Sequence, residues 1–296
     1  MSVHIQRVGD DILIRGIENY RIEQIFDCGQ TFRFEPERAD DGKVTVRGVA
    51  LGRELVLEQS GDSVTVRNMT EEEFDRSFRR YLAVDDDYTA IRRELISGHG
   101  YDCVMEAAMR CGGGIRILHQ DPWEALCSFI VSQNNNIPRI KVIISRMCAS
   151  FGGRIGEDCY AFPTADSLAS AGEAAIFACG TGFRAKYILD AARRVSGGDI
   201  RLDEIEKLPT REAAEELCRI KGVGPKVASC ALLFGFGKTD AFPIDVWVRR
   251  VLAKYYPEDF DPSVFGRYAG LAQQYLFYYE RYECSEAAKN ADGKSR

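Results

Sequence analysis

Three side chains in the last third of the chain have the types and spacing for nucleophilic attack on a sugar carbon. Lys226 follows Pro225, and Cys230 lies four residues later, on the same helical face. Asp245 precedes the stretch VWVRR, where it is expected to cap a helix. Positive helix ends near Lys226 favour its neutral amine. Such an amine forms a Schiff base with an aldehydic sugar carbon, and a nearby carboxylate can stabilise a sugar cation or steer protons.

The elements that must position these residues read as helix, tight turn and helix. A helix is expected from Thr210, its N-cap, to the turn formed by Gly222 and Gly224, and Pro225 suits the first turn of the next helix. A Gly-Val-Gly turn exposes backbone N–H groups at a helix N-terminus, which can bind a nucleic-acid phosphate. Such a hairpin also occurs without catalysis, and the combination of lysine and aspartate favours the enzyme.

On these residues the segment resembles the helix-hairpin-helix DNA glycosylase superfamily, and Lys226 with Cys230 is similar to its 8-oxoguanine DNA glycosylase branch. The resemblance implies that Lys226 is the nucleophile and that Asp245 is essential. It implies removal of 8-oxoguanine from duplex DNA, opposite cytosine, and β-elimination at the abasic site (AP lyase activity), with no metal ion or cofactor. The alternatives are a glycosylase for another damaged base and a non-catalytic helix-hairpin-helix DNA-binding protein.

Two further motifs suit a duplex from which one base has swung out. An amide side chain can fill the hole that this base leaves, and an arginine can read the orphaned partner base. By the resemblance, Asn134 of SQNNNIPR inserts into the duplex and Arg139 contacts the orphan cytosine. Phe183, where the family usually has tyrosine, is the matching aromatic wedge, and Arg184 is a second orphan-base contact. Without the resemblance these motifs read as a polar helix end and an ordinary helix start.

The extruded base needs its own recognition site. Gln273 and Phe277 lie four residues apart on one helical face and would otherwise read as core residues. The resemblance implies that Gln273 reads the Watson–Crick edge, that Phe277 stacks on one face of the base and that Cys230 meets the other. 8-Oxoguanine carries an N7–H donor where guanine has a lone pair. The backbone carbonyl of Gly29, in CGQTFRF, is expected to accept from that donor, and such a site rejects guanine because polar groups would stay unpaired.

Two residues depart from the family pattern. His119 stands where an arginine is common, and Trp247 stands where a histidine often follows the aspartate. Both changes concern the binding of DNA phosphates.

Composition indicates an ordinary globular protein. The chain has 296 residues, a formal net charge of −6 and 45% hydrophobic residues. Neither a run of 18 apolar residues nor a signal-peptide core occurs, so we expect no membrane contact and an intracellular monomer, cytoplasmic or with the nucleoid in a prokaryote. The ten cysteines include no Cys-x-x-Cys pair, so no metal site is expected.

Periodicity predicts an α+β fold. Residues 1–68 alternate apolar and polar side chains between turn signals, which is typical of antiparallel strands, and helical patterns dominate after Gly112. We therefore expect an N-terminal antiparallel β domain (1–112) packed on an all-helical helix-hairpin-helix domain (113–286). A polar tail, 287–296, is expected to be disordered.

Overall fold

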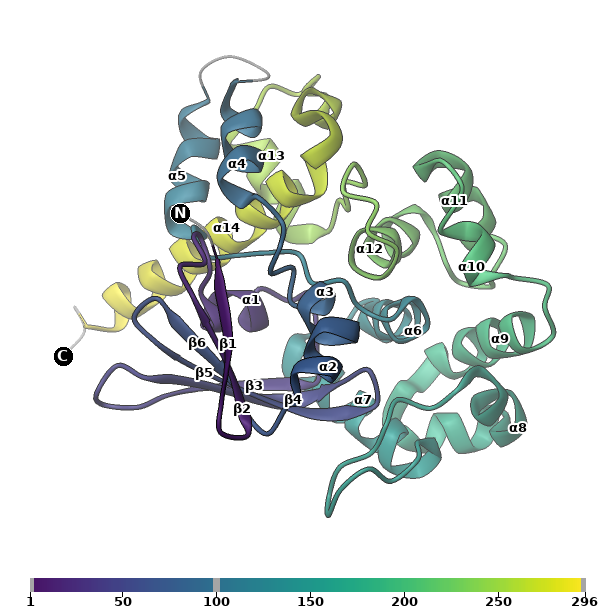
Figure 1. The fold of residues 1–296 in the computed structure, drawn as a ribbon. Coiled ribbons are helices and arrows are strands. Elements are labelled where there is room, and N and C mark those ends of the chain that lie inside the picture. The colour runs from purple at the N-terminus through teal and green to yellow at the C-terminus, as the bar shows by residue number, and fades with distance from the viewer. Residues whose placement is uncertain (1–2, 98–101, 294–296) are drawn as a thin grey trace.

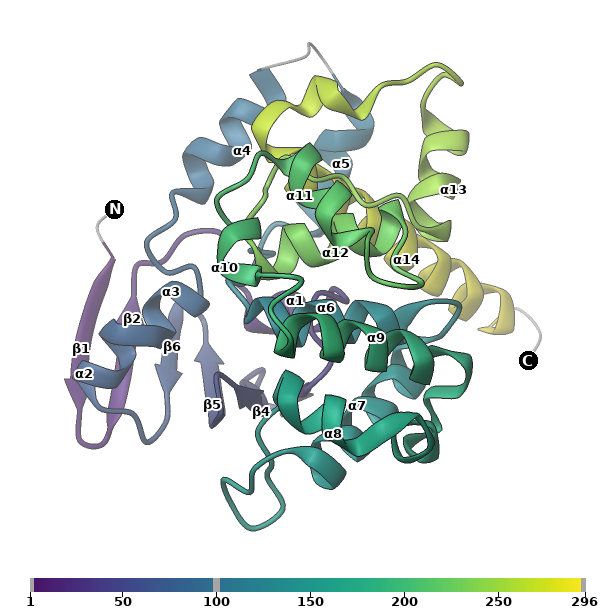
Figure 2. The same cartoon turned by 90° about the vertical axis from the view of Figure 1, so that its right-hand side faces the viewer.

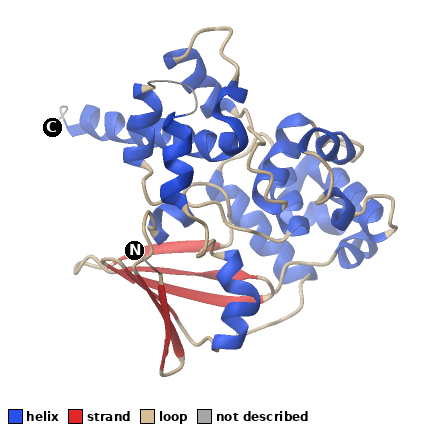
Figure 3. Cartoon of the chain, turned by 45° about the horizontal axis from the view of Figure 1, so that its top comes forward, coloured by secondary structure: helices blue, strands red, loops and turns tan. Residues whose placement is uncertain are grey.

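A computed structural model describes residues 3–97 and 102–293, with side chains up to residue 282. The described residues form six strands, which lie together at one side of the molecule, and helices make up most of the rest (Figures 1 and 3). Two views at right angles show α14 (Ala269–Gly293) beside α5 (Cys103–Cys111) and α13 (Val246–Tyr255) and extending away from them toward the C-terminus (Figures 1 and 2).

The strands form one antiparallel sheet with the order β1-β2-β6-β5-β4-β3. Alternation of buried and exposed side chains along β5 matches the period of a strand with one covered face, and its register with β4 pairs Leu57 with Val46. The turn before β4 contains Gly42 at φ +82°, and the β5–β6 turn contains Gly61 at φ +58°. The strands are β1 (His4–Val8), β2 (Asp11–Arg15), β3 (Phe34–Arg38), β4 (Val44–Ala50), β5 (Arg53–Ser60) and β6 (Ser63–Val66).

Two short helical segments cover the sheet and share its core. The first is α1 (Ile22–Asp27), which buries Ile22, Ile25 and Phe26. The second is a continuous helical run that begins after Thr70, whose hydroxyl caps it by accepting the Glu73 N–H. This run comprises α2 (Glu71–Glu73), the π-helical turn η1 (Phe74–Phe78) and α3 (Arg79–Tyr81).

The rest of the chain is helical. Asp121 and Thr164 each accept a backbone N–H with the side chain and so cap the helices that follow them. Thr210 was predicted wrongly as a cap: it is the first residue of its helix, and its hydroxyl donates to Asp240 at 2.6 Å instead. The elements are α4 (Tyr88–Ser97), α5 (Cys103–Cys111), α6 (Pro122–Ser132), α7 (Ile137–Phe151), α8 (Ala165–Ile176), η2 (Phe177–Thr181), η3 (Gly182–Arg184), α9 (Ala185–Ser196), α10 (Leu202–Ile205), α11 (Thr210–Leu217), α12 (Pro225–Gly235), α13 (Val246–Tyr255), η4 (Pro262–Tyr268) and α14 (Ala269–Gly293).

Two hydrophobic clusters correspond to the sheet and the helices. The sheet cluster is built mainly from residues 12–84, and the helical cluster mainly from residues 88–276. Cys28 and Phe32 follow α1 but belong to the helical cluster, so this segment crosses from one cluster to the other. Gln24 ties the two parts together, because its amide donates to the Cys111 carbonyl at 2.9 Å and accepts the Gly114 N–H at 2.7 Å.

The predicted fold class is confirmed: an antiparallel sheet packs on a helical region. The predicted seam at Gly112 stays a prediction. Helix α14 continues to Gly293, through most of the stretch predicted as a disordered tail, and the alanines and lysine there have high helix propensity. In the part of the chain that is described, no helix has the length and hydrophobicity to cross a lipid bilayer.

Candidate active site

Lys226 lies at the first turn of α12, where this helix packs against α6. The two helices meet through Phe129 and Phe234, whose rings stack at 5.2 Å. The Lys226 ammonium lies 5.8 Å from the centre of the Phe129 ring and 3.5 Å from the Ser132 hydroxyl. The nucleophile candidate is therefore half-buried, with its stem against an aromatic wall and its nitrogen at the C-terminal end of α6.

The buried Cys230 thiol is influenced by both Lys226 and Asp245. It lies one turn after Lys226 on α12 and is 4% exposed. Burial raises the pKa of its thiol to about 11, the positive charge of Lys226 opposes this rise, and the negative charge of Asp245 adds to it. Both residues thus act electrostatically on one buried thiol.

Asp245 caps α13, as its position in the sequence predicts. Its Oδ1 accepts the Val248 N–H at 2.8 Å, and its backbone is extended, as an N-cap requires. The carboxylate is half-buried, whereas its neighbours Ile244 and Val246 are 39% and 59% exposed. Because Oδ1 is hydrogen-bonded to the first turn of α13, the carboxylate has a fixed orientation and so does its second oxygen.

The hairpin between α11 and α12 has the predicted glycine turn. Gly222 adopts φ +80°, and a Cβ there would lie 2.4–2.5 Å from ring atoms of Tyr187, so only glycine fits. Gly224 is the N-cap of α12, and none of the described side chains caps this end of the helix. The first N–H groups of α12 are therefore free to bind an anion.

Gly29 and Phe277 face each other. Gly29 adopts φ +79°, and a Cβ there would lie 3.5 Å from the Phe277 ring and 3.7 Å from Ile137. Within the described part of the chain no hydrogen bond reaches the Gly29 carbonyl. One turn before Phe277 on α14, Gln273 is 4% exposed and its buried Oε1 has no hydrogen-bond partner there. A buried, unpaired polar atom is costly unless something else pairs with it, which indicates a ligand.

The two neighbours of Gly29 are held firmly. Gln274, buried on α14, donates to the Cys28 carbonyl. Gln30 donates to the carbonyls of Ile25 and Arg116 at 2.9 and 2.8 Å and accepts the Leu118 N–H at 2.8 Å. These bonds fix the backbone on both sides of the Gly29 carbonyl.

The segment between α6 and α7 projects the predicted wedge. Asn134 is exposed and adopts φ +47°, a left-handed conformation that asparagine tolerates better than most residues. Asn136 caps α7 by accepting the Arg139 N–H at 3.0 Å. The Arg139 side chain is exposed and forms no ion pair in the described part of the structure. Both predicted side chains are thus exposed to solvent.

Arg184 uses its side chain differently from the prediction. It is 3% exposed and donates to the carbonyls of Gln133, Asn134 and Thr181, with Nη2 2.9 Å from the Asn134 oxygen. In this structure it holds the wedge segment in place, and its contact with an orphan base stays a prediction. Phe183 is 50% exposed, and the Arg184 guanidinium lies 4.5 Å from the centre of its ring.

The segment 132–137 joins these groups into one site. Ser132 contacts the Lys226 nitrogen, Asn134 contacts Arg184, and Ile137 lies beside Gly29. The nucleophile candidate, the wedge and the base-recognition residues therefore surround one short loop.

The two departures from the family pattern have partners of their own. His119 lies 3.2 Å from the Asp86 carboxylate, and this hydrogen bond is the main cause that lowers the pKa of Asp86. The Trp247 ring lies 5.0 Å from the Arg250 guanidinium. Among the described residues, no three His, Cys, Asp or Glu side chains are grouped to hold a metal ion.

Sequence reasoning missed three residues that support the site. Phe129 forms the wall beside Lys226, Gln274 holds the segment before Gly29, and Tyr187 lies beneath Gly222. The pair of adjacent glutamines in AQQYLF was a usable signal, since two neighbouring amides in an apolar helix each need a partner. No local signal marks the two aromatic residues.

Comparison with known proteins gives two family matches that together cover most of the chain. Residues 12–126 match the model described as 8-oxoguanine DNA glycosylase, N-terminal domain, and residues 127–264 match the HhH-GPD superfamily base excision DNA repair protein.

Individual relatives agree with these matches. The N-glycosylase/DNA lyase of Saccharomyces cerevisiae is 40% identical over 158 residues, which are 48% of this chain and 42% of the yeast protein. The N-glycosylase/DNA lyase OGG1 of Arabidopsis thaliana is 34% identical over 191 residues, 56% of this chain and 52% of the plant protein. The chain thus spans about half the length of these curated relatives. The Clostridium acetobutylicum 8-oxoguanine glycosylase/lyase, solved with duplex DNA containing cytosine opposite 8-oxoguanine, is 37% identical with a TM-score of 0.86, over 95% of this chain and 98% of that one.

Proposed function

The chain belongs to the 8-oxoguanine DNA glycosylase family of helix-hairpin-helix base excision repair proteins, and we propose that it removes 8-oxoguanine from duplex DNA and then nicks the abasic strand. The observation that carries this proposal is the position of Lys226 at the first turn of α12, directly after the glycine hairpin, with its nitrogen 5.8 Å from the centre of the Phe129 ring and 3.5 Å from the Ser132 hydroxyl. A nucleophile, a carboxylate and an anion-binding turn then act on one nucleotide.

The proposed reaction begins at the sugar. The Lys226 nitrogen attacks C1′ with its lone pair, the bond from C1′ to the base breaks, and the base leaves with the bonding electrons and is protonated. Opening of the sugar gives a Schiff base between C1′ and Nζ. Loss of a C2′ proton then expels the 3′ phosphate, which breaks the strand. Asp245 faces the positive charge that develops on the sugar, and this chemistry needs no metal ion or organic cofactor.

Lesion recognition is assigned to three groups around the extruded base. The unpaired Gln273 Oε1 accepts from its Watson–Crick edge, the Phe277 ring stacks on it, and the Gly29 carbonyl accepts from N7–H. Guanine offers a lone pair at N7 instead, so two acceptors would face each other. A buried polar mismatch of this kind gives strong discrimination.

The residues of the wedge are proposed to contact the DNA around the extruded base and on the opposite strand. Asn134 fills the space of the extruded base, Phe183 stacks against the neighbouring step, and Arg139 reads the orphan cytosine. All the proposed contacts come from one chain, which suits a monomer acting on genomic DNA inside the cell, at the nucleoid in a prokaryote.

Competitive cleavage of defined duplexes tests the proposal. Duplexes that carry 8-oxoguanine opposite cytosine, an alkylated purine or an oxidised pyrimidine are mixed in equal amounts, and base release is followed under single-turnover conditions. The proposal expects the 8-oxoguanine duplex to be cut first and undamaged guanine to be left intact. Preference for the alkylated purine, or release of no base at all, would overturn it.

A further inference from the structure

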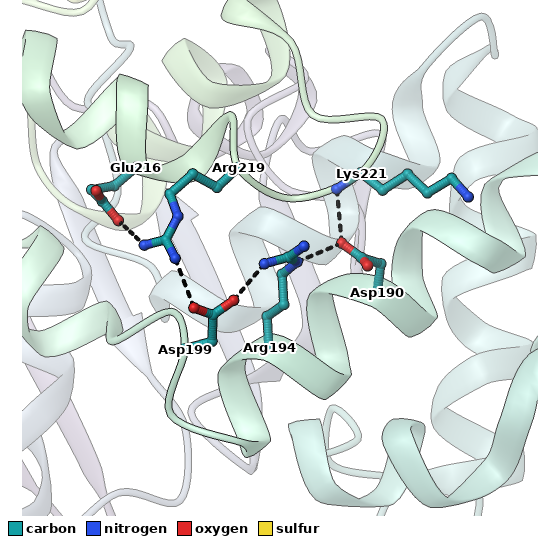
Figure 4. Close-up of polar contacts among 6 residues, drawn as sticks. All are labelled: Asp190, Arg194, Asp199, Glu216, Arg219 and Lys221. Carbon is teal, nitrogen blue, oxygen red and sulfur yellow. Dashed lines mark hydrogen bonds and ion pairs between the residues drawn. The ribbon is translucent and has the colours of Figure 1, made fainter.

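A network of charged residues fastens the hairpin to α9 (Figure 4). Asp190, on α9, accepts the backbone N–H of Lys221 at 2.8 Å and the Nε of Arg194 at 2.9 Å. Arg194 also pairs with Asp199, which accepts from Arg219 at 2.7 Å. The residues just before the glycine turn are thus held to α9 in two ways. Lys221 bonds directly to Asp190, and Arg219 is connected through Asp199 to Arg194.

The Lys221 side chain takes no part in this network. Figure 4 shows it pointing away from Asp190, which it contacts only through its backbone nitrogen. The bond to Asp190 therefore depends on where the backbone of the hairpin lies and not on the lysine side chain.

Helix α9 touches the hairpin a second time, one turn earlier. The Tyr187 ring fills the space beneath Gly222, three residues before Asp190 on the same helix. Phe183 and Arg184, which belong to the proposed wedge, lie immediately before α9. This helix therefore connects the part of the site that enters the duplex with the part that binds a phosphate.

We propose that Asp190 is a positioning residue for DNA binding: by holding the Lys221 N–H it sets the hairpin, and with it the start of α12 and Lys226, at a fixed distance from the wedge. The inference rests on the proposed function, because it requires the wedge and the hairpin to bind one duplex. A shift of the hairpin along α9 would move both the phosphate site and the Lys226 amine, since only four residues separate Lys221 from Lys226.

Loss of the Asp190 charge and loss of its hydrogen bond to Lys221 should change DNA affinity in opposite directions, so the two roles of Asp190 can be told apart. A carboxylate beside a DNA-binding turn repels phosphates, so its removal by itself strengthens DNA binding. Loss of the acceptor for the Lys221 N–H frees the hairpin, which weakens binding. Asp190→Ala removes charge and acceptor together, whereas Asp190→Asn removes the charge and keeps an acceptor oxygen of the same length.

The experiment measures the Kd of the full chain for a duplex with a tetrahydrofuran abasic analogue, and the single-turnover rate of 8-oxoguanine release. We expect Asp190→Ala to raise the Kd about 3- to 10-fold and to slow base release, as loss of one net hydrogen bond implies. Asp190→Asn should bind within about twofold of wild type, or more tightly, because a neutral acceptor remains. Asp190→Ala binding as tightly as Asp190→Asn would overturn the proposal.

Two controls separate positioning from general stability and from the proposed function. Asp166 accepts from Ser196 at the last residue of α9 and forms no described contact with the hairpin, so Asp166→Ala should leave the Kd unchanged or lower it. Thermal unfolding of each variant sets an assay temperature at which all are folded. If Asp190→Ala does not fold, Asp190→Ser replaces it under the same criterion. The serine hydroxyl is one bond nearer the backbone than the aspartate oxygens, so it does not reach the Lys221 N–H. Wild type that binds the analogue but releases no 8-oxoguanine contradicts the proposed function and leaves the comparison of affinities valid.

Discussion

Replacing Gly222 by alanine perturbs the hairpin in a way that can be worked out from the structure. The added Cβ would lie 2.4–2.5 Å from three ring atoms of Tyr187, about 1 Å closer than an ordinary contact. The left-handed φ of +80° costs alanine a further 1–2 kcal/mol or so. Overpacking of this kind costs about 1–3 kcal/mol, so we expect a total loss of roughly 2–5 kcal/mol.

Gly224 provides a matched control two residues away. It adopts φ −106°, and a Cβ there would have no atom within 4 Å. Gly224→Ala loses only part of the N-cap preference of glycine, about 1 kcal/mol or less. In thermal unfolding, Gly222→Ala should lower the Tm by roughly 5–15 °C and Gly224→Ala by at most about 4 °C.

The Tyr187→Ala background isolates the steric part of the effect. Without the ring, Gly222→Ala should cost only the strain of its φ, so the double mutant is more stable than the sum of the single changes by about 1–3 kcal/mol. Equal Tm values for Gly222→Ala and Gly224→Ala, or additive effects of Gly222→Ala and Tyr187→Ala, would refute the packing of the hairpin on α9.

Three further predictions concern charges. Burial raises the pKa of Glu124 to about 7 although Arg33 lies 3.3 Å away, so the stability from its proton is present below about pH 4.5 and is lost as the pH rises through 7. Between pH 5 and 8 the free energy of unfolding of wild type should therefore fall by up to about 3 kcal/mol, and that of Glu124→Gln should not. Parallel plots of stability against pH, from thermal unfolding of the two proteins, would contradict this. Cys230, buried and with its pKa raised to about 11, should react with iodoacetamide at least about tenfold more slowly than the exposed Cys103 when peptides are quantified by mass spectrometry. Lys221→Gln should reduce the slope of log Kd against log salt by about 1, whereas Lys43→Gln, on the sheet, should leave the slope unchanged.

Local signals in the sequence predicted the helix starts well. Asp245, with the stretch after it, became the cap of α13, and Pro225 lies in the first turn of α12, because such signals depend only on residues within one turn. Thr210 shows the limit of such signals. Its hydroxyl is drawn to Asp240, 30 residues away in sequence, and Pro209 takes the cap position instead.

The resemblance predicted which residues gather at the site but not the state of each side chain. Gln273 reads as a core residue in its helix, and only the folded chain shows that its Oε1 is buried with no hydrogen-bond partner among the described residues. Arg184 was expected to face an orphan base, yet it donates to carbonyls of the wedge segment, whose position depends on the packing of α6 and α7. The contact between Asp190 and the Lys221 backbone joins residues 31 positions apart and involves no motif.

The proposed reaction requires the Lys226 nitrogen to bond to the sugar of the damaged nucleotide. Reduction with borohydride during reaction with an 8-oxoguanine duplex would trap that bond, and peptide mass spectrometry would locate it. We predict one DNA adduct, on the peptide that contains Lys226. It should be lost in Lys226→Gln and retained in Lys238→Gln, since the Lys238 nitrogen donates to the carbonyls of Glu206 and Leu208. An adduct on any other residue, or release of 8-oxoguanine by wild type with no adduct, would contradict the proposed reaction.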